Sequence, residues 1–320
     1  MSVLRVLVTG ANGFVGDAIM RALQVAGHHA VGACRELVEL PSHARCVPVG
    51  NIDGYTRWSQ ALGNVECVIH TAARVHVMVD KCVDPLASYR EVNRDGTLRL
   101  ARQAVECGVK RFVFISSIKV NGESTRDGGA FSADDVACPV EPYGISKLEA
   151  ERGLLDLAAE TGLEVVVIRP VLIYGPGVRA NFYSMMHWLN RGVPLPLGRI
   201  NNKRSLVALE NLVSLVLTCI AHPQAVNEVF LASDGEDLST TELLLRLGQA
   251  LQRPALLMPV PCSALIAVAT LLGKRVVASR LCSSLQVDIS KTREILDWAP
   301  SVTVDEALLV TARHYLNRQD

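Results

Sequence analysis

Tyr143 and Lys147 are the residues of this chain whose types and spacing most directly suggest chemistry. They stand four positions apart in the run Tyr143-Gly144-Ile145-Ser146-Lys147, so on a helix they share one face. A free phenol has a pKa near 10 and is a poor acid–base catalyst at neutral pH. A nearby ammonium favours the phenolate and lowers that pKa. The pair therefore predicts a proton-transferring tyrosine, although the same spacing also occurs on ordinary helix surfaces.

A serine pair favours the catalytic interpretation. The apolar run Arg111–Ile115 is typical of a buried strand, and Ser116 and Ser117 follow it directly. In open α/β sheets, ligands bind outside the carboxyl ends of the strands. A serine hydroxyl at that edge can hydrogen-bond the reacting oxygen of a substrate.

A glycine-rich turn near the start of the chain predicts a dinucleotide site. A strand over residues 3–8 runs into the turn 9–16 and then into a helix over 15–26. The three glycines allow a tight turn, close approach to a pyrophosphate and close helix–strand packing. The helix N-terminus supplies free N–H groups for phosphate. We expect cofactor contacts from Gly10, Asn12, Gly13, Phe14, Val15 and Gly16.

The end of the second strand, predicted over residues 29–34, bears on the choice of cofactor. An acidic residue there suits the free ribose of NAD, whereas an arginine can pair the 2′-phosphate of NADP. The strand is followed by Arg35 and then Glu36. Arg35 favours NADP(H). Glu36 keeps NAD(H) possible, because a shift of one residue would exchange the two side chains.

The elements that must position these residues alternate between strand and helix. This alternation indicates an α/β fold with a Rossmann-type, doubly wound parallel sheet. We expect residues 1–170 to form the dinucleotide-binding domain. Residues 171–320 would form mainly a smaller, interleaved substrate-binding lobe, with some segments returning to the core. The predicted strands lie at 3–8, 29–34, 65–71, 111–116 and 163–168, and the predicted helices at 15–26, 86–107 and 143–161.

The second half contains three further predicted helical segments. Residues 239–252 are typical of a helix capped by Ser239 or Thr240, with Glu242 near its third position. The tail over 288–316 is predicted as helix, turn and helix. The apolar segment 264–272 is too short to span a bilayer. We expect it to be a buried or lid helix, because it lacks the flanking basic stripes of a membrane-surface helix.

Composition excludes several other classes of protein. Formal net charge is zero, so no global field attracts nucleic acid or an anionic membrane. Nine cysteines occur without a CxxC pair or a zinc-like spacing, which predicts free thiols in a reducing compartment and no metal site. The apolar start is interrupted by Arg5 and a glycine turn, which is unlike a signal segment. We expect a cytoplasmic protein without a membrane span.

Taken in order, these motifs resemble the extended short-chain dehydrogenase/reductase family, in its group of nucleotide-sugar epimerases and dehydratases. The resemblance covers almost the whole chain. It departs from the usual pattern at Asn51, where the family commonly has Asp. The matching segments are 9–16, Gly50-Asn51-Ile52, His70-Thr71-Ala72-Ala73, 92–97, Ser116-Ser117, Tyr143 with Lys147, and Arg169-Pro170.

The resemblance implies roles for these residues. Tyr143 would exchange a proton with the substrate oxygen while the nicotinamide exchanges hydride with the same carbon. Lys147 would bind the nicotinamide ribose and lower the pKa of Tyr143, and Ser117 would orient the substrate oxygen. Family dimers pair helices corresponding to about 90–107 and 143–161, which implies a homodimer. Further cofactor contacts are implied for Asn51, Ile52, Thr71, Ala72, Ala73, Asn93 and Pro170, although Asn93 could instead brace the active-site strand.

The substrate implied by the resemblance is a UDP-sugar. Asn181 would lie near the substrate phosphates, and Arg204 and Arg280 would contact the diphosphate, which suits the planar, always charged guanidinium. Lys119, two residues beyond Ser117, is a further candidate for substrate binding. The segment that Arg204 opens departs from the family pattern at Ala208 and Asn211, where His and Asp are common.

The choice of reaction rests on a few positions. A dehydratase usually has an Asp-Glu pair where Ile118 and Lys119 stand, so dehydration is disfavoured. Arg35, and the absence at Asn121 of the aromatic residue that many epimerases show, favour a bacterial 4-reductase. That interpretation predicts hydride transfer at C4 of a UDP-4-keto-hexose or UDP-4-keto-hexosamine in the synthesis of surface polysaccharides such as O-antigen lipopolysaccharide. A UDP-hexose 4-epimerase, acting on UDP-Glc/Gal or UDP-GlcNAc/GalNAc, is the alternative. A catalytically inactive cofactor-binding scaffold is disfavoured because Tyr143 and Lys147 are both present.

Overall fold

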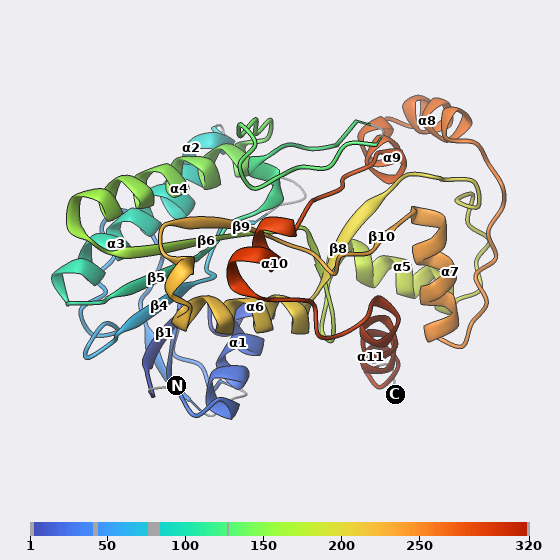
Figure 1. The fold of residues 1–320 in the computed structure, drawn as a ribbon. Coiled ribbons are helices and arrows are strands. Elements are labelled where there is room, and N and C mark those ends of the chain that lie inside the picture. The colour runs from blue at the N-terminus through green and yellow to red at the C-terminus, as the bar shows by residue number, and fades with distance from the viewer. Residues whose placement is uncertain (1–2, 41–43, 76–83, 127, 319–320) are drawn as a thin grey trace.

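A computed structural model of the 320-residue chain describes residues 3–40, 44–75, 84–126 and 128–318. Seven strands in these ranges form one parallel sheet in the order β3-β2-β1-β4-β5-β6-β9 (Figure 1). The chain starts in the middle of the sheet and winds first to one edge and then to the other, so its direction reverses between β1 and β4. The strands are β1 (Arg5–Thr9), β2 (His29–Cys34), β3 (Arg45–Pro48), β4 (Cys67–His70), β5 (Arg111–Ile115), β6 (Glu164–Pro170) and β9 (Glu228–Ala232).

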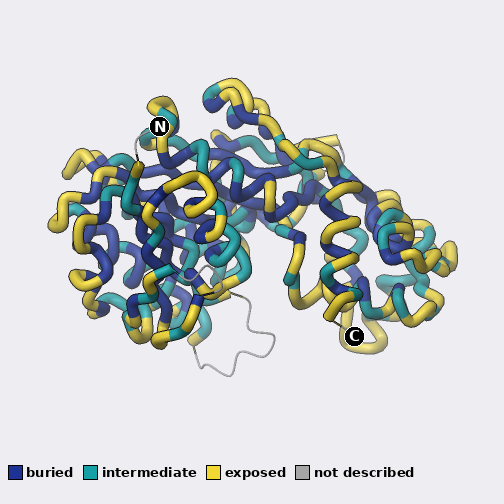
Figure 2. Tube along the Cα trace, turned by 90° about the horizontal axis from the view of Figure 1, so that it is seen from below, coloured by how far each residue is buried: buried dark blue, intermediate teal, exposed yellow. Residues whose placement is uncertain are grey.

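Helices cover both faces of this sheet, and the strand sequences show why. Successive side chains of a strand point to opposite faces. In β5, Val113 and Ile115 join the apolar cluster that contains α1 (Phe14–Val25) and α6 (Leu209–Ala221). Phe112 and Phe114 point the other way. There they pack with α3 (Thr97–Glu106) and α4 (Pro142–Thr161), so the strands form the buried centre of the larger lobe (Figure 2). The predicted doubly wound parallel sheet is confirmed.

The smaller lobe is built around a three-stranded sheet in the order β10-β8-β7. Its own apolar core includes Tyr174, Phe182, Leu244 and Leu308. Ser239 accepts a hydrogen bond from the backbone N–H of Glu242, whose carboxylate accepts one in return from the N–H of Ser239. The predicted cap is therefore confirmed. The elements are β7 (Leu172–Tyr174), β8 (Arg204–Ala208), β10 (Asp237–Leu238), α5 (Ala180–Asn190), α7 (Thr240–Ala250) and α11 (Val304–Leu316).

Segments from the second half also return to the large sheet. β9 pairs in parallel with β6, from Val166 opposite Glu228 to Pro170 opposite Ala232. The helix α6 packs against α1 on one face of the sheet, and α10 (Ser290–Leu296) packs against β9. The sequence analysis did not predict β3 or β9, which form the two edges of this sheet.

Two predicted helices differ from the structure. The helix expected over 86–107 is divided into α2 (Pro85–Arg90), a π-helical turn η1 (Glu91–Gly96) and α3, and such turns are frequent at functional sites. The segment predicted as a buried or lid helix forms α8 (Cys262–Leu271), of which no residue is buried, so its burial was wrongly predicted. No helix within the described ranges is long and apolar enough to cross a membrane.

Candidate active site

The glycine turn after β1 packs tightly against the end of β4. Gly10 has φ +66°, and a Cβ there would lie 3.0 Å from Ala72 Cα and 3.1 Å from Thr71 Oγ1. A Cβ on Gly16 would lie 2.2 Å from the carbonyl oxygen of Gly10. Neither position can therefore take a side chain without moving backbone. The turn also receives Thr71, whose hydroxyl donates to the carbonyl of Thr9 at 2.6 Å.

The first turn of α1 fits a pyrophosphate. Its N-cap is Gly13, which has no side chain to cap the free N–H groups. Asn12 and Gly13 are exposed, and Phe14 and Val15 are half-buried. The N–H groups at a helix start carry partial positive charge and bind phosphate oxygens. The arrangement can therefore hold the diphosphate of a dinucleotide, with Gly10 and Gly16 allowing its close approach.

The residues that would meet the adenosine end lie beyond β2. β2 ends at Cys34, and Arg35 and Glu36 are both exposed just past it. The N–H of Gly50 donates to the carbonyl of Arg35 at 3.1 Å, which brings the exposed Asn51 to the same end of the sheet. The half-buried Ile52 lies against Gly96 of η1, where a Cβ would be 2.5 Å from Ile52 Cγ2. This packing explains the glycine of the 92–97 motif.

Below the turn, a buried histidine joins three elements. His70 Nδ1 lies 2.7 Å from Thr9 Oγ1, and its Nε2 lies 2.9 Å from Thr97 Oγ1. Burial and the nearby charge of Lys147 lower the pKa of His70 to about 3. The ring is therefore neutral at physiological pH and links β1, β4 and α3 as a structural group.

Asn93 braces the active-site helix. Its amide nitrogen donates to the carbonyl of Arg74 at 3.1 Å and to Ser146 Oγ at 3.0 Å, while its oxygen accepts from the N–H of Arg74 at 2.8 Å. Ser146 in turn donates to the carbonyl of Tyr143 at 2.8 Å. Both N–H groups of the Asn93 side chain are thus committed to protein partners. These hydrogen bonds brace the helix and not the active-site strand that the sequence had offered as the milder role. A cofactor contact of Asn93 stays a prediction.

Ser117 and Tyr143 meet across the ends of β5 and α4. They share a hydrogen bond, which lowers the pKa of Tyr143, but burial raises it to about 12. Gly144 makes the approach possible, because a Cβ there would lie 2.6 Å from the carbonyl oxygen of Lys119. The ring of Tyr89 lies edge-on to Tyr143, with centroids 6.1 Å apart. The sequence had not singled out Tyr89.

Lys147 is buried one turn along the same helix. Its Nζ donates to the carbonyl of Ile115 at 2.8 Å and lies 4.2 Å from the ring centroid of Phe114. Burial lowers the pKa of Lys147 to about 7, opposed by the charge of Glu151. We expected Lys147 to lower the pKa of Tyr143. In the structure that pKa is raised, because burial of the phenol outweighs the hydrogen bond of Ser117, which favours its ionised form.

A buried polar network that the sequence did not reveal supports these residues. Glu151 accepts hydrogen bonds from Arg169 and Ser116. Arg169 also donates to Asn121 Oδ1 at 3.0 Å. Each of these side chains is at least nine-tenths buried. One signal was available, since Glu151 repeats the four-residue spacing of Tyr143 and Lys147.

The proposed phosphate ligands Arg204 and Arg280 are neighbours. Arg204 Nη1 donates to the backbone carbonyl of Arg280 at 2.8 Å, and burial followed by the charge of Arg280 lowers the pKa of Arg204. Two neighbouring guanidinium groups of like charge form a favourable place for an anion. Arg280 also pairs with Glu141, whose other oxygen lies 3.8 Å from Lys119 Nζ. Lys119 contacts Glu123 as well.

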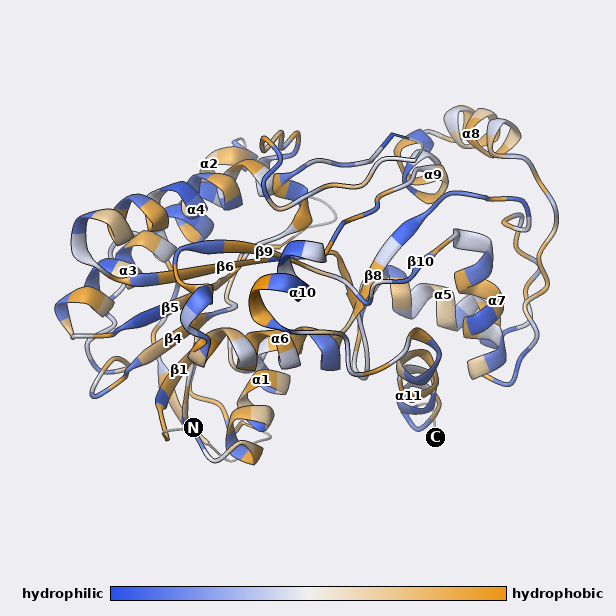
Figure 3. Ribbon diagram, viewed as in Figure 1, coloured by the Kyte–Doolittle hydropathy of each residue, from blue (hydrophilic) through white to orange (hydrophobic). Residues whose placement is uncertain are grey.

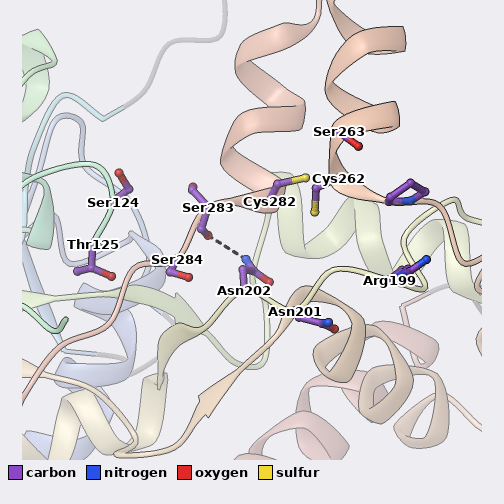
Figure 4. Close-up of a pocket in the computed structure, with 11 residues that line it drawn as sticks. Ser124, Thr125, Arg199, Asn201, Asn202, Cys262, Ser263, Cys282, Ser283 and Ser284 are labelled. Atoms are coloured by element: carbon purple, nitrogen blue, oxygen red, sulfur yellow. Dashed lines mark hydrogen bonds between the residues drawn. The ribbon is translucent and has the colours of Figure 1, made fainter. Parts of the chain in front are cut away.

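Next to these arginines lies a polar cavity of about 660 Å³, which Figure 4 shows in close-up. It lies between the loop at Ser124 and Thr125 and the smaller lobe, and its size suits part of a nucleotide. Asn202 Nδ2 donates to the carbonyl of Ser283 at 2.8 Å at its edge. Further lining residues are Arg199, Asn201, Cys262, Ser263, Cys282 and Ser284.

Two of the predicted site residues are not joined to this cluster. Asn181 is exposed at the start of α5, directly after Ala180 with its unusual φ of +54°. Pro170 is buried at the end of β6, opposite Ala232. Within the described ranges, neither side chain takes part in the hydrogen bonds and ion pairs of the site. Their contacts with phosphate and cofactor stay predictions.

Comparison with known proteins shows the family to which this fold and site are similar. The sequence profile described as the NAD dependent epimerase/dehydratase family matches residues 6–232. A UDP-glucose 4-epimerase of Vibrio cholerae is 46% identical over 312 residues, which cover 97% of this chain and 95% of the relative. The structure of UDP-glucose 4-epimerase from Thermotoga maritima with UDP-glucose has a TM-score of 0.79 at 23% identity, covering 99% of this chain and 100% of that chain. MoeE5 in complex with UDP-glucuronic acid and NAD has a TM-score of 0.77 at 25% identity, with the same coverage.

The expectation of a 4-keto reductase is wrong. The 46% identity to a UDP-glucose 4-epimerase, over nearly the whole of both chains, favours the alternative that the sequence left open. The structure explains why two of the signals misled. Asn121 is buried, where its amide binds Arg169 and the carbonyl of Ser132, so its identity reflects packing. Arg35 is exposed beside an equally exposed Glu36, so it does not single out NADP.

Proposed function

This chain belongs to the NAD dependent epimerase/dehydratase family, and from that membership we propose that it is a UDP-hexose 4-epimerase that interconverts UDP-glucose and UDP-galactose. The observation that carries the proposal is the 46% identity to the Vibrio cholerae UDP-glucose 4-epimerase. The cluster of Ser117, Tyr143 and Lys147 supports it, because inversion at C4 requires a group that removes and returns one proton.

NAD, which the glycine turn at Gly10, Gly13 and Gly16 would hold by its pyrophosphate, would supply the acceptor and donor of hydride for C4 of the sugar. Tyr143 removes the proton from the C4 hydroxyl as the carbonyl forms and gives it back when the hydroxyl is restored. Ser117 holds the C4 oxygen through its hydroxyl. The net reaction leaves the redox state of sugar and cofactor unchanged, so neither an external oxidant nor a reductant is consumed.

The raised pKa of Tyr143 must fall before its phenolate, the form that accepts the proton of the C4 hydroxyl, is populated at neutral pH. The hydrogen bond of Ser117 acts in that direction. We propose that the positive charge of Lys147, on the same face of α4, adds to it. Glu151 helps to keep Lys147 protonated against burial. The Glu151–Arg169 pair thus supports catalysis through Lys147.

The substrate would be held through its diphosphate. Arg204 and Arg280 lie beside the polar cavity. Lys119, which follows the active-site strand, lies near Glu141, the ion-pair partner of Arg280. An incoming diphosphate would compete with Glu141 for Arg280, because both are anions that suit a guanidinium fork. Asn181 is the remaining candidate for a phosphate contact.

The cofactor we propose is NAD. An epimerase uses its cofactor in both directions within one turnover, which requires tight retention and no exchange for a second reduced carrier. Either Glu36 or Arg35 could reach the ribose, since both follow β2. The dinucleotide released by denaturing the purified protein, identified by mass spectrometry, distinguishes NAD from NADP.

The assembly we propose is a homodimer through α3 and α4, which lie side by side on one face of the large sheet (Figure 1). A buried four-helix contact would double the mass in solution. Light scattering coupled to size exclusion measures that mass, and a monomer at micromolar concentration would contradict the proposal.

The decisive experiment supplies UDP-glucose or UDP-galactose to the purified protein without added cofactor and follows both sugars by anion-exchange chromatography. We expect the same equilibrium mixture from either side and no net change in absorbance at the nicotinamide band. Deuterium placed at C4 should stay in the sugar. Absence of interconversion, combined with stoichiometric oxidation of NADPH in the presence of a UDP-4-keto-sugar, would overturn the proposal.

A further inference from the structure

The helices α8 and α9 (Arg275–Cys282) form a hairpin that projects from the smaller lobe, away from the seven-stranded sheet (Figure 1). The two helices pack mainly against each other. No residue of α8 is buried, and in α9 only Ala278 is buried. The hairpin therefore contributes little to the core of the lobe that carries it.

The far end of this hairpin is strongly apolar and exposed, as the hydropathy colouring of Figure 3 indicates for α8. A helix that is apolar around most of its circumference normally lies in a protein core or in lipid. Here the apolar side chains face water, and contiguous exposed patches of this kind mark interaction sites. The exposed fractions are 57% for Val268, 88% for Leu271, 69% for Leu272, 64% for Val276 and 57% for Val277.

The charge around this patch has one sign. Lys274 caps the start of α9 and Arg275 is its first residue, and both are exposed. The whole stretch from residue 243 to residue 287 contains no Asp or Glu. The patch thus combines apolar side chains with a cationic rim and lacks the carboxylates that an anionic surface would repel. The sequence analysis had found no flanking basic stripe, although Lys274 and Arg275 follow the apolar segment 264–272 after a single glycine.

We propose that the hairpin tip, formed by Val268, Leu271, Leu272, Lys274, Arg275, Val276 and Val277, docks on an anionic phospholipid membrane. The apolar side chains enter the boundary between headgroups and acyl chains, and the two cations contact lipid phosphates. α8 is too short to cross the bilayer, so the protein lies on the surface. A second copy of the chain fits less well, since a two-fold contact at this patch would bring Lys274 and Arg275 of both copies together.

The base of the hairpin remains attached to the candidate active site. Cys262 begins α8 and Cys282 ends α9, and both line the polar cavity (Figure 4). Asn202 donates to the carbonyls of Leu281 and Ser283, and Arg280 pairs with Glu141 at the start of α4. Docking through the tip would therefore leave these contacts in place and hold the cavity close to the membrane surface.

The test is co-sedimentation of the full chain with vesicles of phosphatidylcholine alone and of equal parts phosphatidylcholine and phosphatidylglycerol. We expect sedimentation with the anionic vesicles that weakens at high salt, because screening reduces the lipid attraction. The variant Leu271→Ser/Leu272→Ser should bind about tenfold or more weakly, since several buried methylene groups are lost. Lys274→Gln/Arg275→Gln should lose the preference for anionic lipid.

The matched control is Val25→Ser/Val310→Ser, which removes exposed valines of α1 and α11 and should sediment like the unchanged protein. The melting temperature and the turnover of soluble UDP-glucose verify that each variant is folded. If the proposed activity proves wrong, the melting temperature alone serves as this control. A Leu271→Trp variant adds a direct signal, a blue shift of its emission on anionic vesicles. The absence of vesicle binding, equal binding by Leu271→Ser/Leu272→Ser, or self-association lost in that variant would each overturn the proposal.

Discussion

Arg169 Nη2 lies 2.6 Å from Glu151 Oε2, in an ion pair whose side chains are only 7% and 2% exposed. Glu151 also accepts a hydrogen bond from Ser116, and Arg169 donates to Asn121. The pair therefore joins the ends of β5 and β6 to the helix that carries Tyr143 and Lys147. The charge of Glu151 raises the pKa of Lys147 against the effect of burial. We therefore expect this ion pair to position and tune the proposed reacting groups, Tyr143 and Lys147, without touching the substrate.

Replacing Glu151→Gln should lower the pKa of Lys147 below its present value of about 7. The ammonium would then be lost at lower pH, so the alkaline limb of the kcat/KM profile should move to lower pH. The buried Arg169 would also lose its partner, which costs about 3–5 kcal/mol in the free energy of unfolding. Glu149→Gln, on the same helix but in the more exposed pair with Arg90, is the control and should leave the profile in place. An unchanged profile in Glu151→Gln would contradict the tuning role.

Replacing Tyr143→Phe should reduce epimerisation by about 10²–10⁴-fold, the usual contribution of a general acid–base group. Folding and UDP binding should persist, because the ring and its packing are retained. Tyr89→Phe is the matched control, since its ring lies beside Tyr143 and has no assigned proton to transfer. Steady-state rates with UDP-glucose, together with calorimetric binding of UDP, separate the two effects. Comparable losses in both variants would argue against Tyr143 as the proton-transfer group.

Replacing Gly16→Ala should abolish retention of the dinucleotide and destabilise the fold by about 1–3 kcal/mol, as overpacking does. The reason is the Cβ position 2.2 Å from the carbonyl oxygen of Gly10. Gly63→Ala provides the control, because a Cβ at Gly63 meets nothing within 4 Å. Denaturant unfolding and the absorbance of released cofactor measure both outcomes. A Gly16→Ala protein that still retains its dinucleotide would contradict the assignment of the glycine turn as the dinucleotide site.

Replacing Arg204→Gln should raise the KM for UDP-glucose by about 10–100-fold, since a hydrogen bond to a charged group contributes about 1.5–3 kcal/mol. Arg253→Gln, an exposed arginine of the same lobe, should leave KM unchanged. Initial rates over a range of substrate concentration distinguish an effect on KM from one on kcat. A loss confined to kcat would place Arg204 outside the diphosphate site.

Because His70 is buried in its neutral form, we expect the free energy of unfolding to fall as the pH is lowered. Its pKa is about 3 in the folded chain and about 6.5 when unfolded. Between these values the unfolded state binds the extra proton, so stability is fully present above about pH 6.5 and is lost as pH falls toward 3. The slope from this group approaches about 1.4 kcal/mol per pH unit. Urea unfolding of the unchanged protein and of His70→Asn, measured at the same series of pH values, isolates the contribution of His70. If the free energy of unfolding changed with pH equally in the two proteins, the depressed pKa of His70 would be refuted.

The sequence alone determined the features that are local. Tyr143 and Lys147 share a helix face because a fixed spacing has a fixed geometry, and the turn from β1 into α1 was readable because strand, glycines and helix are contiguous. The same holds for the cap of α7 at Ser239 and for the alternation of strands and helices that indicated the parallel sheet. Comparison with relatives, rather than any single residue, decided between the reductase and the epimerase.

Only the tertiary structure brought together Glu151 with Arg169, Arg204 with Arg280, and Arg280 with Glu141, which is 139 positions away in the chain. It also left α8 exposed, although its composition had suggested burial. The physical reason is the same in each case. Local propensity depends on neighbouring residues, whereas burial, charge pairing and pKa depend on which distant segments the fold packs against a side chain.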